Sequence, residues 1–310
     1  MVPPSILGAI GNTPIVELTR VVPKGCARIL AKIEWANPTG SMKDRMALSI
    51  IDGAIAKGLL APDGTVVEYT AGTTGISLAL VCAARGYKLA IVTSDAFSME
   101  KRRTMRALGA TVTEVPSDQG KINEKLIKTI IETSRVLSEQ PGHWWCDQLN
   151  NHDGITGYHA LGDEVWRQTE GKVDAIVQSV GTAHSIHGIA ESLRQHKSDL
   201  HIAAVEPAES AVLSGGPSGS HKIEGIGIGF IPPLWRPDQV SEIIPVSTQD
   251  AIDMARRIAR EEGLFAGTSS GANVVAAIRV AQKLGPGATV VTLMVDSGLR
   301  YLTTEPYASV

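Results

Sequence analysis

Short apolar runs alternate with segments of helical periodicity along almost the whole chain. The runs are rich in Val, Ile, Leu and Ala, and they predict strands at 27–35, 65–70, 88–95, 110–115, 174–180, 201–207 and 288–298. Helical patterns follow many of them, and helices are expected from about residue 43, over 76–86 and 98–109, and after residue 185. Continuous apolar strands that alternate with helices are typical of a parallel sheet covered on both faces. The pattern therefore predicts an α/β fold with mostly parallel sheets.

The chain has 310 residues and no obvious linker, which suits one large domain or two smaller domains that share an active-site cleft. The polar, glycine-rich stretch 214–230 interrupts the alternation and is expected to form a long functional loop. Ligands of open α/β folds bind at the carboxyl ends of the strands. Residues that bind a ligand are therefore expected in the turns that follow the strands.

Composition and charge exclude several classes of function. A formal net charge of −3 without a basic block gives no long-range attraction for nucleic acid or an anionic membrane. No apolar run is long enough to span a bilayer, and residues 1–14 lack the basic region of a signal peptide. The three cysteines lie far apart without a CxxC pair, which disfavours a zinc site or a disulfide framework. We expect a cytoplasmic protein.

Three segments rich in Gly, Thr and Ser are predicted to join a strand to a helix: TAGTTG (70–75), GTAHS (181–185) and AGTSSG (266–271). Each would present backbone N–H groups at a helix start, which is a site for an anion. Neither a GxxxxGK[ST] motif nor a GxGxxG motif between a strand and a helix is present, which disfavours the usual nucleotide sites. The expected anions are a phosphate and a carboxylate.

Lys43 falls on the first turn of a predicted helix, where the helix dipole disfavours a cation and favours the neutral amine. A neutral amine can form a Schiff base with an aldehyde. A phosphate site, a carboxylate site and such a lysine together suggest pyridoxal phosphate acting on an amino acid. The alternative is a solvated surface lysine.

A resemblance to a known family extends over essentially the whole chain. The segments that carry it are IGNTPIVEL (10–18), NPTGSMKDR (37–45), SMEKRRTMRALGA (98–110), DQLNN (147–151), EPAESAVLSGG (206–216), IEGIGIGFIP (223–232), EEGLFAGTSSGAN (261–273) and DSGLRYL (296–302). In this order they resemble the cysteine synthase and cystathionine β-synthase family of fold-type II pyridoxal-phosphate enzymes.

The resemblance implies a two-domain, three-layer αβα fold like that of the tryptophan synthase β subunit. Residues 41–148 would form the smaller domain with the substrate-carboxylate loop. Residues 1–40 and 149–310 would form the larger domain with the phosphate loop. A homodimer is implied, and a serine acetyltransferase is a possible partner.

The resemblance also implies roles for individual residues. Lys43 would be the Schiff-base lysine and the general base, and Ser269 would hydrogen-bond the pyridine nitrogen. The phosphate would be held by Gly181, Thr182, Ala183, His184 and Ser185. The substrate carboxylate would be bound by the loop Thr70, Ala71, Gly72, Thr73 and Thr74, with Gln148 nearby and Gly225 at the mouth of the site.

Four residues depart from the family pattern. Ala71 replaces a serine, and Thr73 replaces an asparagine that contacts the ring hydroxyl of the cofactor. Ala183 and His184 replace two glycines, which preserves the backbone donors only where φ need not be positive. His184 would either bind the phosphate or face solvent. With His187 it forms an HxxH pair without a nearby acidic residue, so no metal is expected.

The implied reaction is β-replacement on a serine derivative through an aminoacrylate. The first expectation is cysteine synthesis from O-acetylserine or O-phosphoserine and sulfide, as part of amino-acid biosynthesis. Cystathionine synthesis and β-elimination of cysteine are the enzymatic alternatives. A regulatory or binding homologue of low activity is the non-enzymatic one.

Overall fold

The structure is a computed structural model that describes residues 5–120 and 124–308. The first four residues of the stretch 1–14, tested above for a signal peptide, lie outside the described residues. The strands are β1 (Ile15–Leu18), β2 (Arg28–Ile33), β3 (Thr65–Tyr69), β4 (Lys88–Ser94), β5 (Thr111–Val115), β6 (His143–Trp145), β7 (Ala175–Ser179), β8 (His201–Pro207), β9 (Glu242–Val246) and β10 (Thr289–Met294).

The α-helices are α1 (Lys43–Ala56), α2 (Thr73–Arg85), α3 (Met99–Ala107), α4 (Glu124–Ser138), α5 (Asp153–Thr156), α6 (His159–Gln168), α7 (His184–Arg194), α8 (Thr248–Glu261) and α9 (Thr268–Leu284). Short 3₁₀ turns occur at η1 (Ile6–Ala9), η2 (Glu34–Ala36), η3 (Ala208–Ser210), η4 (Pro237–Gln239) and η5 (Gly298–Tyr301).

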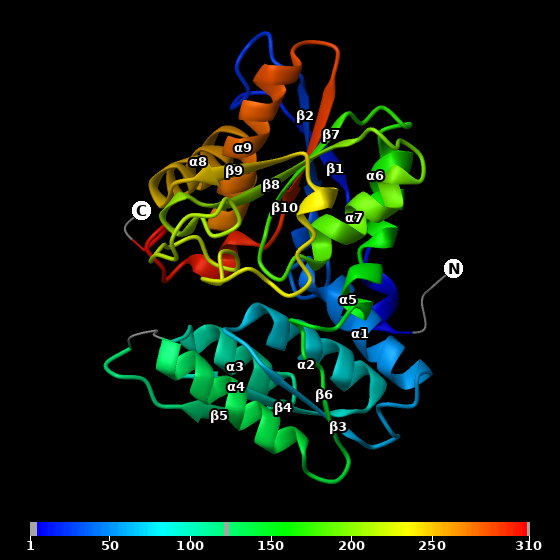
Figure 1. Ribbon diagram of the computed structural model, residues 1–310, viewed down its shortest axis with the longest axis vertical. Helices are drawn as coiled ribbons and strands as arrows, with labels where there is room; N and C mark the ends of the chain where they lie inside the picture. The colour runs from blue at the N-terminus through cyan, green and yellow to red at the C-terminus, as the bar shows by residue number, and fades with distance from the viewer. Residues whose placement is uncertain (1–4, 121–123, 309–310) are drawn as a thin grey trace. The chain divides into compact units, whose positions relative to one another are not determined.

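The chain divides into two compact units (Figure 1). Unit 1 comprises Met1–Ile10 and Lys43–Gly157, and unit 2 comprises Gly11–Met42 and Tyr158–Val310. The sequence analysis placed 1–40 and 149–310 together, whereas Met1–Ile10 and the segment that follows Gln148 up to Gly157 cluster with unit 1. The roles expected of the two domains stay predictions.

Unit 1 contains a four-stranded sheet in the order β5-β4-β3-β6, and all of its neighbouring strands are parallel. Helix α4 packs on β3 and β4, and Tyr69 lies beside its buried residues Leu126 and Ile130. Because side chains alternate along a strand, Glu68 points to the opposite face of the sheet. Helices α1 and α2 contact one another in the same unit.

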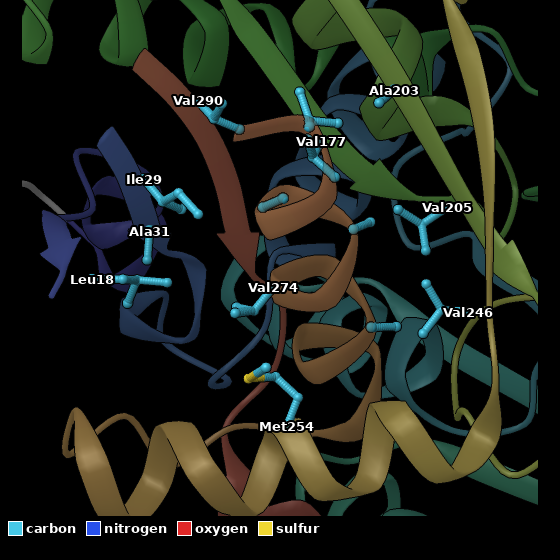
Figure 2. Packing of buried hydrophobic residues seen from close by; sticks show 14 of the residues in the cluster. Leu18, Ile29, Ala31, Val177, Ala203, Val205, Val246, Met254, Val274 and Val290 are labelled. Atoms are coloured by element: carbon cyan, nitrogen blue, oxygen red, sulfur yellow. The ribbon is translucent and has the colours of Figure 1, made fainter. Parts of the chain in front are cut away.

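Unit 2 contains a six-stranded sheet in the order β1-β2-β10-β7-β8-β9. Strand β1 is antiparallel to β2, and the other pairs are parallel. Helix α9 contacts β7, β8 and β10 and is buried along most of its length. Figure 2 shows Val177, Val205 and Val290 of the strands around α9, with Val274 on the helix and Met254 of α8 beyond it. Helix α9 is thus the centre of this apolar core.

The expected α/β fold with mostly parallel sheets is confirmed, and each predicted strand overlaps an observed one. The long loop expected over 214–230 contains no helix or strand. One local prediction is wrong: AGTSSG follows α8 and not a strand, and Ala266 forms only an isolated bridge with Ser297. Strands β1, β6 and β9 were not predicted.

All three cysteines are free; Cys82 and Cys146 are buried and Cys26 is half-buried. Within the described ranges, no helix combines the length and the apolar character that crossing a bilayer requires.

Gly271 allows the backbones of α8 and α9 to approach closely. A Cβ at this position would meet the carbonyl oxygen of Ala251, and it would lie 2.8 Å from the backbone nitrogen of Ala255. Real Cβ atoms do not approach backbone atoms so closely, so one helix would have to move. Packed interiors resist such a shift.

We expect Gly271→Ala to lower the free energy of unfolding by about 3 kcal/mol, because the added methyl group overpacks this contact. In an open helix the same change would stabilise the chain by about 1 kcal/mol. Denaturant unfolding of the full chain measures the effect. Gln282→Ala, an exposed position on α9, is the control and should stay within about 0.5 kcal/mol of wild type. A stabilised Gly271→Ala variant would contradict the packing described.

Candidate active site

Lys43 is the first residue of α1 and is half-buried. The next residue, Asp44, is fully buried and accepts a 2.6 Å hydrogen bond from Ser77 Oγ in α2. A buried carboxylate needs such donors to offset its lost hydration. The bond therefore fixes the first turn of α1 against α2, the helix that begins at the predicted carboxylate loop.

The turn that precedes Lys43 is held within unit 2. Met42 donates its backbone N–H to Val295 O at 3.0 Å. Ser41 donates its hydroxyl to Asp296, which also accepts a 2.9 Å bond from Tyr301. Burial and the neighbouring Asp296 raise the pKa of Tyr301 well above its usual range, so this phenol stays a donor. The backbone is therefore fixed up to the residue before the lysine.

The predicted carboxylate loop of unit 1 joins β3 to α2. Thr70 is buried, and its Oγ1 accepts the N–H of Gly72 at 2.9 Å. Gly72 precedes α2 with φ of +147°, and a Cβ there would collide with the side chain of Lys101. The residue before α2, Gly72, has no side chain with which to cap the helix, and the first N–H groups of a helix have no acceptor within the helix itself. Ala71 is exposed.

Gln148 is brought to this loop by its side chain and by its backbone. Its Oε1 accepts from Thr74 Oγ1 at 2.8 Å, and its Nε2 donates to Tyr69 O at 3.0 Å. Its backbone N–H donates to Glu68 Oε2 at 2.9 Å. Gln148 is only 8% exposed, so its amide is held in one orientation.

The predicted phosphate loop of unit 2 joins β7 to α7. Ala183 precedes α7 in the left-handed conformation, with φ of +71°, and no side chain caps the helix. Gly181 lies against the glycine-rich loop, because a Cβ there would be 2.6 Å from Gly225 O. Ser185 is buried and accepts from Gln178 Nε2 at 3.2 Å. Gly225 itself is exposed, with φ of +86°.

His184 does not face solvent. It is 1% exposed, and its Nδ1 lies 2.7 Å from Oγ1 of Thr182 in the same loop. The interpretation of His184 as a solvent-facing histidine is therefore wrong. His187 is also buried and accepts the N–H of Arg236 at 3.1 Å, and burial lowers the pKa of this imidazole to about 4.

Ser269 lies in the first turn of α9 and is buried. The preceding Thr268 accepts the N–H of Glu224 at 3.2 Å, which ties the glycine-rich loop to the start of α9. One turn later, Asn273 accepts from Ser179 N at 2.8 Å and donates to Gln178 Oε1 at 3.0 Å. The end of β7 and the start of α9 are thus connected through buried hydrogen bonds.

The predicted site residues therefore form two groups. Unit 1 contains Lys43, Thr70, Ala71, Gly72, Thr73, Thr74 and Gln148, and unit 2 contains Gly181, Thr182, Ala183, His184, Ser185, Gly225 and Ser269. The hydrogen bonds and close approaches above connect members within each group.

The residues of unit 2 fit a phosphorylated cofactor. The start of α7 offers backbone N–H groups that no side chain caps, and such groups suit a dianion. Gly181 has no side chain, which allows the backbone of this loop to pack directly against Gly225. The buried hydroxyls of Ser185 and Ser269 supply neutral donors and acceptors beside it.

Glu68, Ser77 and Asp296 contribute to the site, and the sequence analysis missed all three. The sequence contains one indication that Glu68 is functional. It is a charged residue inside the apolar run TVVEY, and charged residues are rarely buried. The sequence contains no such indication for Asp296 and Ser77, because their hydrogen-bond partners are distant in sequence.

Comparisons with known proteins identify relatives over almost the whole chain. Residues 6–296 match the family model described as pyridoxal-phosphate dependent enzyme. A cysteine synthase of Staphylococcus aureus is 40% identical over 307 residues, which cover 98% of this chain and 97% of that protein.

Two solved structures are similar in fold and sequence. A cysteine synthase from Entamoeba histolytica superposes with a TM-score of 0.93 at 38% identity, over 99% of this chain and 91% of that one. An O-acetylserine-dependent cystathionine β-synthase from Helicobacter pylori gives 0.91 at 34% identity, over 99% of both chains.

We expect Ala183→Gly to raise the free energy of unfolding by about 0.5–1 kcal/mol. The left-handed conformation costs an L-residue roughly 1–2 kcal/mol, which glycine avoids. The greater entropy of glycine in the unfolded state lowers this gain by roughly 0.5–1 kcal/mol. Thermal and denaturant unfolding measure the change. Ala190→Gly in the middle of α7 is the control, and it should lose about 1 kcal/mol or more. Equal losses for both variants would show that Ala183 carries no strain.

Proposed function

This chain belongs to the family of pyridoxal-phosphate-dependent enzymes, and from that premise we propose that it is a cysteine synthase. The reaction would be β-replacement on O-acetylserine or O-phosphoserine with sulfide. The observation that carries the proposal is the full-length similarity to cysteine synthases, at 40% identity. The order of Lys43, Gln148 and Ser269 along the chain is consistent with it.

Unit 2 would hold the cofactor. Gly181, Ala183 and Ser185 would bind its phosphate through the uncapped start of α7. His184 would orient Thr182 through the bond between them, leaving that hydroxyl directed by a buried imidazole. Ser269 would meet the ring nitrogen with a neutral hydroxyl and not with a carboxylate.

Unit 1 would bind the amino acid and move its proton. The start of α2 at Thr73 and Thr74 and the hydroxyl of Thr70 suit the substrate carboxylate. Thr73 stands where the family has an asparagine and would offer one hydroxyl to the cofactor. Gln148, held by Thr74 and Tyr69, would orient the bound carboxylate.

Lys43 would perform the acid–base steps. The cofactor supplies the electron-withdrawing system that makes the substrate α-proton acidic. Lys43 would hold the cofactor aldehyde until substrate arrives, take the proton from Cα, and return it to Cα once the new C–S bond has formed. The bond between Asp44 and Ser77 keeps the first turn of α1 fixed during these steps.

We further propose a cytoplasmic homodimer, with a serine acetyltransferase as a possible partner. The family resemblance implies the dimer and the partner. A particle mass of two chains in analytical ultracentrifugation would support the dimer, and a single-chain mass would exclude it.

A donor and acceptor panel with product mass tests the reaction. We expect O-acetylserine or O-phosphoserine with sulfide to give cysteine as the main product. Cystathionine from homocysteine, with sulfide unused, would favour the second candidate, which the similarity to the Helicobacter pylori enzyme supports. Pyruvate and sulfide from cysteine alone would favour β-elimination. No product in any combination would overturn the proposal of an enzyme.

The variant Lys43→Ala, measured in the same panel, tests whether Lys43 transfers the proton. Loss of the proton-transfer group should lower turnover by about 10²–10⁴-fold, and the visible absorbance of the bound cofactor should change. Lys125→Ala, at an exposed position on α4, is the matched control and should leave both unchanged. Turnover that survives in Lys43→Ala would mean that another residue moves the proton.

A further inference from the structure

Glu68 is a fully buried carboxylate near the end of β3 with no cation beside it. It is 0% exposed, and among the residues that the structure describes it forms no ion pair with Lys, Arg or His. Its Oε1 accepts the N–H of Tyr69 at 2.9 Å, and its Oε2 accepts the N–H of Gln148 at 2.9 Å. The thiol of Cys146 is a third hydrogen-bond partner. Three neutral donors therefore hold this anion.

These donors come from segments that surround the carboxylate loop. Tyr69 directly precedes Thr70, and Gln148 is bonded to Thr74 through its side chain. Between Cys146 and Gln148, Asp147 has φ of +45°, a conformation that costs a non-glycine residue free energy. Glu68 accepts the N–H that this conformation turns toward it. Removing that acceptor would release the restraint on Gln148.

We propose that Glu68 is a positioning residue, whose ionised carboxylate holds Gln148 in the orientation that receives the substrate carboxylate. The inference rests on the proposed function, because it assigns Glu68 to the amino-acid site of unit 1. Glu68 would touch neither substrate nor cofactor, and it would act only through the N–H of Gln148.

The protonation state of Glu68 controls how strongly it accepts hydrogen bonds. Burial raises the pKa of this carboxyl from 4.5 to about 7, against the lowering effect of the bonds from Gln148 and Tyr69. A protonated carboxyl has one oxygen engaged as a hydroxyl donor and carries no charge, so it accepts the N–H groups of Gln148 and Tyr69 more weakly than the carboxylate does. Gln148 is therefore held best above pH 7 and released in part below it.

The groups around Glu68 do not take over its effect on how firmly Gln148 is held. Cys146 and Asp147 follow β6, and the negative charge of Asp147 raises the pKa of Glu68 further. Strand β4 presents Ile91 opposite Glu68, and α4 covers the other face of β3. In α2 the titratable group near Cys146 is Cys82, whose pKa burial raises to about 12. Asp44 of α1 is engaged by Ser77.

The backbone amide of Gln148 gives a direct readout. In holoenzyme labelled with ¹⁵N-glutamine, we expect its amide signal to shift between pH 6 and 8 with a midpoint near 7. The signal is assigned by its absence in Gln148→Asn. In Glu68→Gln, which is neutral at every pH, the signal should stay constant. A wild-type signal that does not titrate would overturn the inference, and this measurement needs no catalytic activity.

Kinetics provide the second readout. Glu68→Gln retains one amide acceptor and so mimics the protonated carboxyl. We expect the ratio of its KM for the amino-acid substrate to that of wild type to be near one at pH 6. At pH 8 it should be about threefold to tenfold higher, as the loss of one hydrogen bond predicts. Titration of the substrate amine cancels in this ratio. kcat and the absorbance of the bound cofactor should change little.

Glu139→Gln is the matched control, because it is the same substitution at an exposed site in the turn that directly follows α4. Its KM ratio should stay at one throughout. A Glu68→Gln ratio that does not vary with pH, in an enzyme that turns over, would overturn the positioning role. If neither wild type nor Glu139→Gln turns over any serine ester, the proposed function fails, and the amide titration still decides the inference.

Discussion

Helices α2, α7 and α9 begin without a side-chain cap from the residue before them, and the candidate chemistry depends on that constraint. Helices α2, α7 and α9 start after Gly72, Ala183 and Gly267, and none of these residues offers a side-chain acceptor. The first N–H groups of a helix must nevertheless find partners. The proposed phosphate and substrate carboxylate would be acceptors of this kind at the starts of α7 and α2.

Buried polar side chains fix the positions of the segments around these helix starts. In unit 2, Asn273 links Gln178 to Ser179, while Asp296 engages Ser41 and Tyr301. In unit 1, Ser77 engages Asp44. Each of these groups would be costly to leave unpaired in the interior. The loops therefore have few alternative conformations, and a site is pre-organised when the groups that hold it are themselves satisfied.

The sequence predicted the long apolar strands well, because continuous burial leaves a strong pattern. It missed β6, which has only three residues, and β9, which contains Pro245 at the edge of its sheet. Such strands exist because a neighbour pairs with them. The family resemblance supplied the roles of Lys43 and Ser269, but the left-handed conformation of Ala183 and the burial of Glu68 required coordinates. Both are properties of tertiary contacts between distant residues.

The buried cysteines have a consequence for a chain proposed to handle sulfide. Thiol–disulfide exchange requires a thiolate and access to it. Burial raises the pKa of Cys82 to about 12, and it raises that of Cys146 well above its usual range. Both sulfurs therefore remain protonated and shielded from the small sulfur nucleophiles in their surroundings. The proposed reaction would therefore leave these two interior sulfurs unchanged, and the half-buried Cys26 is the cysteine that remains open to oxidation.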